Sequence, residues 1–177
     1  MPNNPEEKIY LTYKTRMTTE ARLRFTSLVS NAMLSWYSFA LIVFSLLDLS
    51  NKFSIANFSM ISAVVSIAIF SMSIFVYGER YSDRAEQFRS CYLKLQSLYE
   101  SNLTTPMKMQ RYAEILSLYE NQSDKDYDEM LFDAFLRSQK LENAHGPVRI
   151  SLVKFFEVLA KRLLRGALLA AIISLPL

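Results

Sequence analysis

The side chains whose types and spacing could carry a function lie on one face of each of two apolar segments in this chain of 177 residues. Segments 28–47 and 58–78 contain no charged residue, and the polar residues within each recur at helical spacing. At about 100° per residue, they fall within an arc of about 80° in the first segment and about 60° in the second. The first stripe contains Asn31, Ser35, Ser38 and Ser45, with Ile42 in its middle, and the second contains Ser59, Ser62, Ser66 and Ser73, with Ile69 close by.

Two kinds of chemistry suit such stripes, and the sequence leaves both open. Small hydroxyl side chains let neighbouring membrane helices approach closely, so the stripes are candidate helix-packing faces. In an assembly of several chains, one stripe would instead line a shared pore, which rings of Ile42 or Ile69 would close by dewetting. No carboxylate or lysine interrupts either segment, which disfavours a proton-coupled transporter or a charge-selective filter.

The rest of the sequence offers little for catalysis, metal binding or cofactor binding. One histidine and one cysteine, His145 and Cys91, cannot form a zinc site, and no phosphate-loop, dinucleotide-binding, metalloprotease or serine-hydrolase motif is present. His145 precedes Gly146-Pro147, a helix stop signal, and is predicted to be a cap residue. Asp126 and Asp128 are interpreted as a solvated cap at a helix start. We therefore predict a protein that is not an enzyme and has neither cofactor nor metal, with Cys91 as a reduced thiol.

Both apolar segments are predicted to span a membrane. The chain is 51% hydrophobic although 21% of its residues are charged, because the apolar residues are concentrated in blocks. Each block has about twenty residues, roughly the length needed to cross the hydrocarbon core. The connection between them, 48–57, is too short to hold a domain, so the spans must form an antiparallel hairpin. The largely polar residues 1–27 and the second span argue against a signal peptide.

Basic residues predict the orientation of the hairpin. They are Lys14, Arg16, Arg22 and Arg24 before the first span and Arg80, Arg84, Arg89 and Lys94 after the second, whereas the connection contains only Lys52. Positive charge is retained in the cytoplasm, so both termini are predicted to be cytoplasmic. We expect Arg16, Arg22, Arg80 and Arg84 to form a cytoplasmic charged belt, either as topology anchors or as functional contacts.

Helices are also predicted outside the membrane. The second span is expected to continue past Gly78 as one rod whose apolar seam packs on the same chain or on a second copy; the seam contains Tyr81, Ala85, Phe88, Tyr92, Leu95 and Tyr99. Thr105-Pro106 is expected to open the next helix, and a further helix is expected over about 127–143. The tail 147–177 begins as a basic amphipathic helix and turns wholly apolar from Gly166, too short a stretch for a third span. It would serve as an interfacial anchor, a partial insertion or an oligomer contact.

The sequence thus predicts an all-α membrane protein: a two-transmembrane helical hairpin with a helical cytoplasmic region and a C-terminal amphipathic and apolar helix. We expect one unit over 1–177, made of a cytoplasmic N-terminal helix (1–27), a first span (28–47), an external loop (48–57), a second span (58–78), cytoplasmic helices (79–146) and a membrane-associated tail (147–177).

Several short motifs connect this architecture to a known family. They are Tyr13-Lys14-Thr15-Arg16 and Arg22 before the first span, Trp36-Tyr37 and the LIVFSL stretch within it, and a block that runs from Tyr77-Gly78-Glu79-Arg80 through Arg84-Ala85-Glu86 to Tyr92, Leu95 and Leu98-Tyr99. With these motifs, over most of its length, the chain resembles the SLATT family, the SMODS and SLOG-associating two-transmembrane effector domain of bacterial defence systems.

The resemblance implies a role that residue spacing does not show. It implies an effector in the bacterial inner membrane that acts in anti-phage defence by abortive infection. Such an effector would oligomerise and form a pore or disrupt the membrane when a separate sensor, a nucleotide-second-messenger enzyme or a reverse transcriptase, detects infection. The expected partners are therefore the lipid bilayer, further copies of the chain and a sensor, without direct nucleic-acid binding. The alternative is a non-conducting membrane anchor or scaffold that recruits a soluble partner enzyme.

Overall fold

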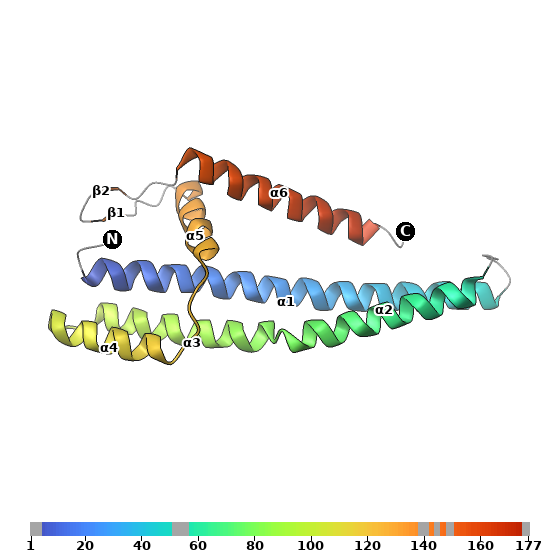
Figure 1. Ribbon diagram of the computed structural model, residues 1–177, viewed down its shortest axis with the longest axis horizontal. Coiled ribbons are helices and arrows are strands. Elements are labelled where there is room, and N and C mark those ends of the chain that lie inside the picture. Colours follow the sequence, from blue (N-terminus) through green and yellow to red (C-terminus); the bar gives the residue numbers. More distant parts are fainter. Residues whose placement is uncertain (1–4, 51–56, 138–141, 144–145, 148–150, 175–177) are drawn as a thin grey trace.

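The computed structural model describes residues 5–50, 57–137, 142–143, 146–147 and 151–174, and it is almost entirely helical (Figure 1). The elements are α1 (Pro5–Leu49), α2 (Phe58–Gly78), α3 (Tyr81–Glu100), α4 (Thr105–Ser117), α5 (Asp124–Leu136), β1 (Glu142–Asn143), β2 (Gly146–Pro147) and α6 (Leu152–Ser174). The all-α prediction is confirmed. The two-residue strands pair antiparallel as a small hairpin between α5 and α6.

The longest element, α1, forms the axis of the molecule. Its 45 residues join the expected N-terminal helix and the first apolar segment into one uninterrupted helix, about 67 Å long at 1.5 Å per residue. Pro5 stands in the first turn, where a missing N–H has no cost, and Glu6 and Glu7 complement the positive end of the helix dipole. No proline or glycine follows within the helix, so the polar and apolar halves of α1 are rigidly connected.

The chain after the second apolar segment differs from the expected continuous rod. Residues 58–100 follow one path, but the helix is interrupted where α2 ends at Gly78 and α3 begins at Tyr81. Arg80 adopts a left-handed conformation, with φ 49° and ψ 40°, which costs roughly 1 kcal/mol for a residue with a side chain. Figure 1 shows the resulting break between α2 and α3.

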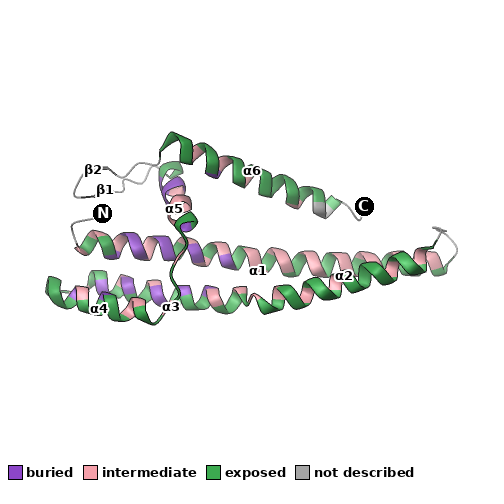
Figure 2. Cartoon of the chain, in the orientation of Figure 1, coloured by how far each residue is buried: buried purple, intermediate pink, exposed green. Residues whose placement is uncertain are grey.

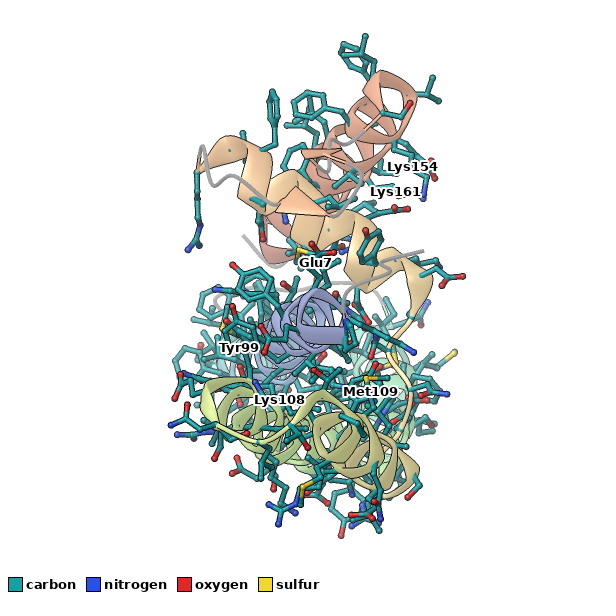
Figure 3. All side chains as sticks on the ribbon, turned by 90° about the vertical axis from the view of Figure 1, so that its left-hand side faces the viewer. Glu7, Tyr99, Lys108, Met109, Lys154 and Lys161 are labelled. Atoms are coloured by element: carbon teal, nitrogen blue, oxygen red, sulfur yellow. The ribbon has the colours of Figure 1, made fainter. Side chains whose placement is uncertain are left out.

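The helices form layers around α1. In the view of Figure 3, α1 lies in the middle, α3 and α4 lie on one side of it, and α5 and α6 lie on the other. Lys108 on α4 fastens the first layer, since its Nζ donates to the Glu6 carboxylate at 2.8 Å and to the Tyr99 carbonyl at 3.2 Å. We call residues 5–27 of α1, together with α3, α4 and α5, the head.

Buried residues lie mainly in the head (Figure 2). On α1 the buried positions Ile9, Thr12, Arg16, Thr19 and Leu23 recur at alternating spacings of three and four. Facing them on α3 are the buried residues Ala85, Phe88, Cys91, Leu95 and Leu98. This spacing is that of a helix–helix zipper, and within the described chain α3 forms it with the same chain's α1. Of the predicted seam, Ala85, Phe88 and Leu95 are buried, Tyr81 and Tyr92 are half-buried, and Tyr99 lies at the edge.

The boundaries of α4 and α5 differ from the sequence prediction by one to several residues. Thr104, rather than Thr105, precedes the first turn of α4. A capping box starts α5 earlier than expected, because Ser123 Oγ accepts the Lys125 N–H and the Asp126 carboxylate accepts the Ser123 N–H. The end of α5 at Leu136 is also earlier than expected, and β1 and β2 occupy part of the predicted helix and its stop signal. His145, the predicted cap, lies outside the described residues.

The last helix, α6, combines the basic amphipathic stretch and the apolar stretch in one element. Three of its basic residues pair with acidic residues of α5: Lys154 with Asp128 at 2.7 Å, Arg162 with Asp133 at 2.8 Å, and Arg165 with Glu129 at 3.2 Å. Aromatic packing of Phe155 on Phe132, at 4.9 Å between ring centroids, adds an apolar contact. Three basic residues of α6 are thus held by carboxylates of α5, and the association of this helix with the membrane stays a prediction.

The apolar hairpin shows the opposite pattern of burial. Every residue of α2 is at least partly exposed, and large apolar side chains such as Ile67 and Phe70 are about two-thirds exposed. Together with the apolar half of α1, α2 is long and apolar enough to cross a membrane. Exposed apolar surface of this extent is stable in lipid but not in water.

Candidate functional site

The stripe of the first apolar segment lies mostly on open surface. Asn31, Ser35, Ile42 and Ser45 are exposed, and Ser38 is half-buried. Five further half-buried residues of the apolar half of α1 recur at spacings of three and four: Leu34, Tyr37, Leu41, Phe44 and Asp48. At about 100° per residue their mean direction is about a quarter-turn from the stripe. Ser35, Ile42 and Ser45 of the first stripe are therefore open to another molecule.

The stripe of the second apolar segment overlaps the hairpin contact. Ser62, Ile69 and Ser73 are half-buried, whereas Ser59 and Ser66 are exposed at the margin. The structure does not bring the two stripes face to face along their length. It brings them together at one end, where Asn31, Ser73 and Arg80 line an open groove of about 850 Å³ beside the break between α2 and α3.

Four of the serine hydroxyls in the stripes are satisfied within their own helices. Ser45 donates to the Leu41 carbonyl at 2.8 Å, and Ser66 donates to the Ser62 carbonyl at 2.7 Å. Ser62 and Ser73 make equivalent bonds one turn back in α2. A hydroxyl that bonds to the preceding turn does not need a partner on another helix. The stripes thus offer a small, neutral surface that tolerates both a helix and water.

The four arginines of the predicted belt have different surroundings. Arg80 is exposed and pairs with Asp83. Arg84 pairs with Glu120 through two bonds of 3.1 and 2.8 Å, and this hydrogen bonding raises the pKa of Arg84 above its ordinary value. These two ion pairs do not test whether the arginines form a charged belt, which stays a prediction. Arg16 and Arg22, in contrast, have buried contacts that the sequence did not indicate.

Arg16 lies in the centre of the head, with no exposed surface. Its Nε donates to Gln122 Oε1 at 3.1 Å, and its Nη1 donates to Cys91 Sγ at 3.0 Å. The guanidinium carbon lies 5.7 Å from the centroid of the Phe88 ring. Among the described residues, Nη2 has no hydrogen-bond partner and no carboxylate lies within ion-pair distance of Arg16. The head therefore contains a buried cation without a counter-ion.

Arg22 follows Arg16 along α1 and has a buried counter-ion. Its Nε and Nη2 donate to the two carboxylate oxygens of Asp126 at 2.7 and 3.2 Å. The Asp126 side chain is 1% exposed, so this residue is not the solvated cap that the sequence suggested. It caps α5 and at the same time fixes α5 to α1. The Ser123-x-x-Asp126 spacing is the sequence signal that would have placed the start of α5 here.

Cys91 should react slowly with thiol reagents in the folded protein. It is fully buried, and burial raises the pKa of its thiol, an effect that the nearby Arg16 partly offsets. At neutral pH the unreactive thiol form therefore predominates. We expect maleimide to label Cys91 about a hundredfold more slowly than a cysteine placed at exposed Ser97 in a Cys91→Ala chain. Denaturant should remove the difference, and equal rates in the folded state would contradict the described α1–α3 interface.

Metal and cofactor binding find no support in the described part of the chain, where no three His, Cys, Asp or Glu side chains are grouped as metal ligands. The non-enzymatic role stays a prediction.

A long apolar helical hairpin attached to a small helical head defines a two-transmembrane α-helical protein. The chain belongs to the SMODS and SLOG-associating 2TM effector domain family 5 (SLATT_5), whose family model matches residues 3–177. This confirms the family that the sequence motifs suggested. The chain is thus a membrane effector domain associated with defence systems. No curated protein and no solved structure gives a significant match.

Proposed function

We propose that this protein is an inner-membrane effector of an anti-phage system that acts by abortive infection. Both termini lie in the cytoplasm, and copies of the chain assemble and permeabilise the membrane when a separate sensor protein triggers them. Family membership supports the effector role and the association with a sensor. The basic flanks of the hairpin support the orientation.

The observation that carries the permeabilising step is the exposure of the first stripe. A lone hairpin in lipid has no reason to keep Ser35 and Ser45 on an exposed face. Polar side chains within membrane spans are rare on lipid-facing surfaces and mark helix contacts or aqueous paths. In an assembly, the first stripes of neighbouring copies would surround a lumen, with Ile42 as its apolar constriction.

A pair of substitutions in the first stripe tests this proposal. Ser35→Leu combined with Ser45→Leu should reduce the ionic current through reconstituted bilayers about tenfold or more, because the lumen would lose its hydroxyl surface and narrow. The matched control is Ser71→Leu, which adds the same side chain to an exposed position of α2 away from both stripes. Currents are recorded with and without a co-encoded partner protein. A double variant that conducts as well as the control would refute the proposed lumen.

The second candidate is a non-conducting anchor that recruits a soluble enzyme to the membrane. The hydroxyls favour it in one respect, since Ser45 and Ser66 already bond within their own helices and need no water. The same experiment separates the two functions. Growth arrest in cells without current from the wild-type protein, alone or with its partner, would establish the anchor.

A further inference from the structure

A basic groove lies between α1, α5 and α6, on the side of α1 opposite α3. Its volume is about 520 Å³, and it is open to solvent. Five cationic side chains line it: Lys14, Arg22, Arg137, Arg162 and Arg165. The groove is independent of the serine stripes, and nothing in the proposed permeabilising step uses it.

The charges in and beside the groove do not balance. Three of the arginines have a carboxylate each: Arg22 pairs with Asp126, Arg162 with Asp133 and Arg165 with Glu129. In the described part of the chain, no carboxylate lies within ion-pair distance of Lys14 or Arg137. Lys14 lies instead over the rings of Tyr10 and Tyr13. Two positive charges therefore remain for an anionic ligand.

An apolar groove of about 410 Å³ continues from the basic one. The two share Arg22, Phe25, Arg165 and Leu169. From this shared level the apolar groove extends between α1 and α6 to Val29, Met33 and Leu168. Val29 and Met33 belong to the apolar segment 28–47, so the two grooves pass from the head into the level of the membrane.

The groove lining along α1 changes from cationic to apolar, in the same order as the headgroup and acyl chains of a phospholipid. From Lys14 to Met33 the helix rises about 28 Å at 1.5 Å per residue, and its lining changes from cationic to apolar on the way. We propose that the joined grooves bind one anionic phospholipid. Its phosphate lies in the basic groove, where the unpaired charges of Lys14 and Arg137 attract it beside Arg22 and Arg165, and an acyl chain follows Val29 and Leu168. A basic pocket between helices at the membrane surface is a recurrent type of site for acidic lipid headgroups.

A soluble anion fits less well. It would use the basic groove but would leave the apolar groove, at membrane depth, without a function. A phospholipid occupies both and also connects α6 to α1, between which the described residues form no ion pair. The bound lipid would therefore fix the position of the apolar half of α6.

The first test compares lipids that differ only in headgroup. The full chain in detergent is mixed with phosphatidylglycerol or with phosphatidylcholine of identical acyl chains, and retained lipid is counted by native mass spectrometry. We expect clear preference for phosphatidylglycerol, and Arg165→Gln should weaken retention about fivefold, the effect of one basic residue near an acidic lipid surface. Lys161→Gln is the matched control. It removes the same charge from α6 (Figure 3), but Lys161 pairs with Glu157 and does not line the groove.

A second variant separates lipid binding from folding. Gly166 lines the basic groove, and a Cβ added there would meet no atom within 4 Å. Gly166→Leu fills the groove while it improves helix propensity, so α6 should become no less stable as lipid retention falls about tenfold. Circular dichroism checks the helix content of each variant.

Three results would overturn the proposal. One is equal retention of the two lipids by the wild-type chain. Another is equal retention of phosphatidylglycerol by Arg165→Gln, Gly166→Leu and Lys161→Gln in folded protein. The third is displacement of phosphatidylglycerol by millimolar inorganic pyrophosphate, which would identify the groove as a site for a soluble anion.

Discussion

Replacing Arg16 by methionine should raise the thermal unfolding midpoint of the head. Arg16 is fully buried, and within the described chain its charge has no counter-ion and its Nη2 has no hydrogen-bond partner. Methionine has a similar length and shape without the charge. Replacement of buried ionic groups by apolar residues of similar volume stabilises proteins by about 1–4 kcal/mol in favourable cases. We expect the free energy of unfolding to increase within that range for Arg16→Met, and the midpoint to rise with it.

The groups that Arg16 now contacts explain why its loss should be tolerated. Gln122 is half-buried, so its amide oxygen can bond to water once Nε is gone. Cys91 has a thiol, for which an unmade hydrogen bond costs little. Phe88 would keep an apolar neighbour, because a thioether packs well on an aromatic ring.

The control is Arg89→Met, which makes the same replacement at an exposed position of α3 and should change the midpoint little. Arg16→Ala should lower the midpoint, because it leaves a cavity. Midpoints are measured in detergent by circular dichroism at fixed protein and lipid concentrations. A lower midpoint for Arg16→Met than for the wild-type chain would show that the bonds to Gln122 and Cys91 outweigh the cost of burying the charge.

The apolar hairpin and the zipper face of α1 differ in how far the sequence predicts them. The apolar hairpin was predictable because a charge-free run of about twenty residues is a local property. The zipper face of α1 was not, because Thr12, Arg16 and Thr19 occupy positions where apolar residues are expected. In the structure, Thr12 and Thr19 are accommodated because each hydroxyl donates to a carbonyl one turn back.

The partner of a helix face is harder to predict than the face itself. The α3 seam was evident from the spacing of Ala85, Phe88 and Leu95, but only the fold shows that α1 of the same chain covers it. The candidate stripes have the same difficulty. Their polar residues could be found from periodicity, whereas the exposure of Ser35 and the partial burial of Ser62 depend on which faces the hairpin brings together. The left-handed Arg80 had no signal in the sequence, because glycine and asparagine are the usual residues for that conformation.

The attachment of α5 to α1 depends on Arg22 and Asp126, and breaking this pair should strongly destabilise the head. The two residues are far apart in sequence, and their two hydrogen bonds fasten α5 to α1 just before the apolar segment begins. The α5 helix in turn holds α6 through three ion pairs. Loss of the pair should therefore loosen α5 and α6 together.

The two single substitutions should have unequal effects, because the partners differ in burial. Arg22→Met leaves the carboxylate of Asp126 buried with 1% exposure and without its cation, and removal of one partner from a buried pair typically costs about 3–5 kcal/mol. Asp126→Asn leaves Arg22 35% exposed and therefore able to bind water, and the amide oxygen still accepts the Ser123 N–H. We expect a loss of about 1.5–3 kcal/mol for Asp126→Asn, the value of hydrogen bonds to a charged group.

The double variant tests whether the larger loss in Arg22→Met comes from the buried charge that it leaves on Asp126. Once Asp126→Asn has made that side chain neutral, the loss of Arg22 no longer strands a charge, so Arg22→Met combined with Asp126→Asn should be more stable than Arg22→Met alone by about 1–2 kcal/mol. Chemical denaturation in detergent measures all four chains, and limited proteolysis between α5 and α6 reports whether the loosening is local. If the losses of the two single variants simply add in the double variant, the pair contributes no coupling and α5 must be held to α1 mainly by the apolar contacts of Leu11, Met130 and Leu131.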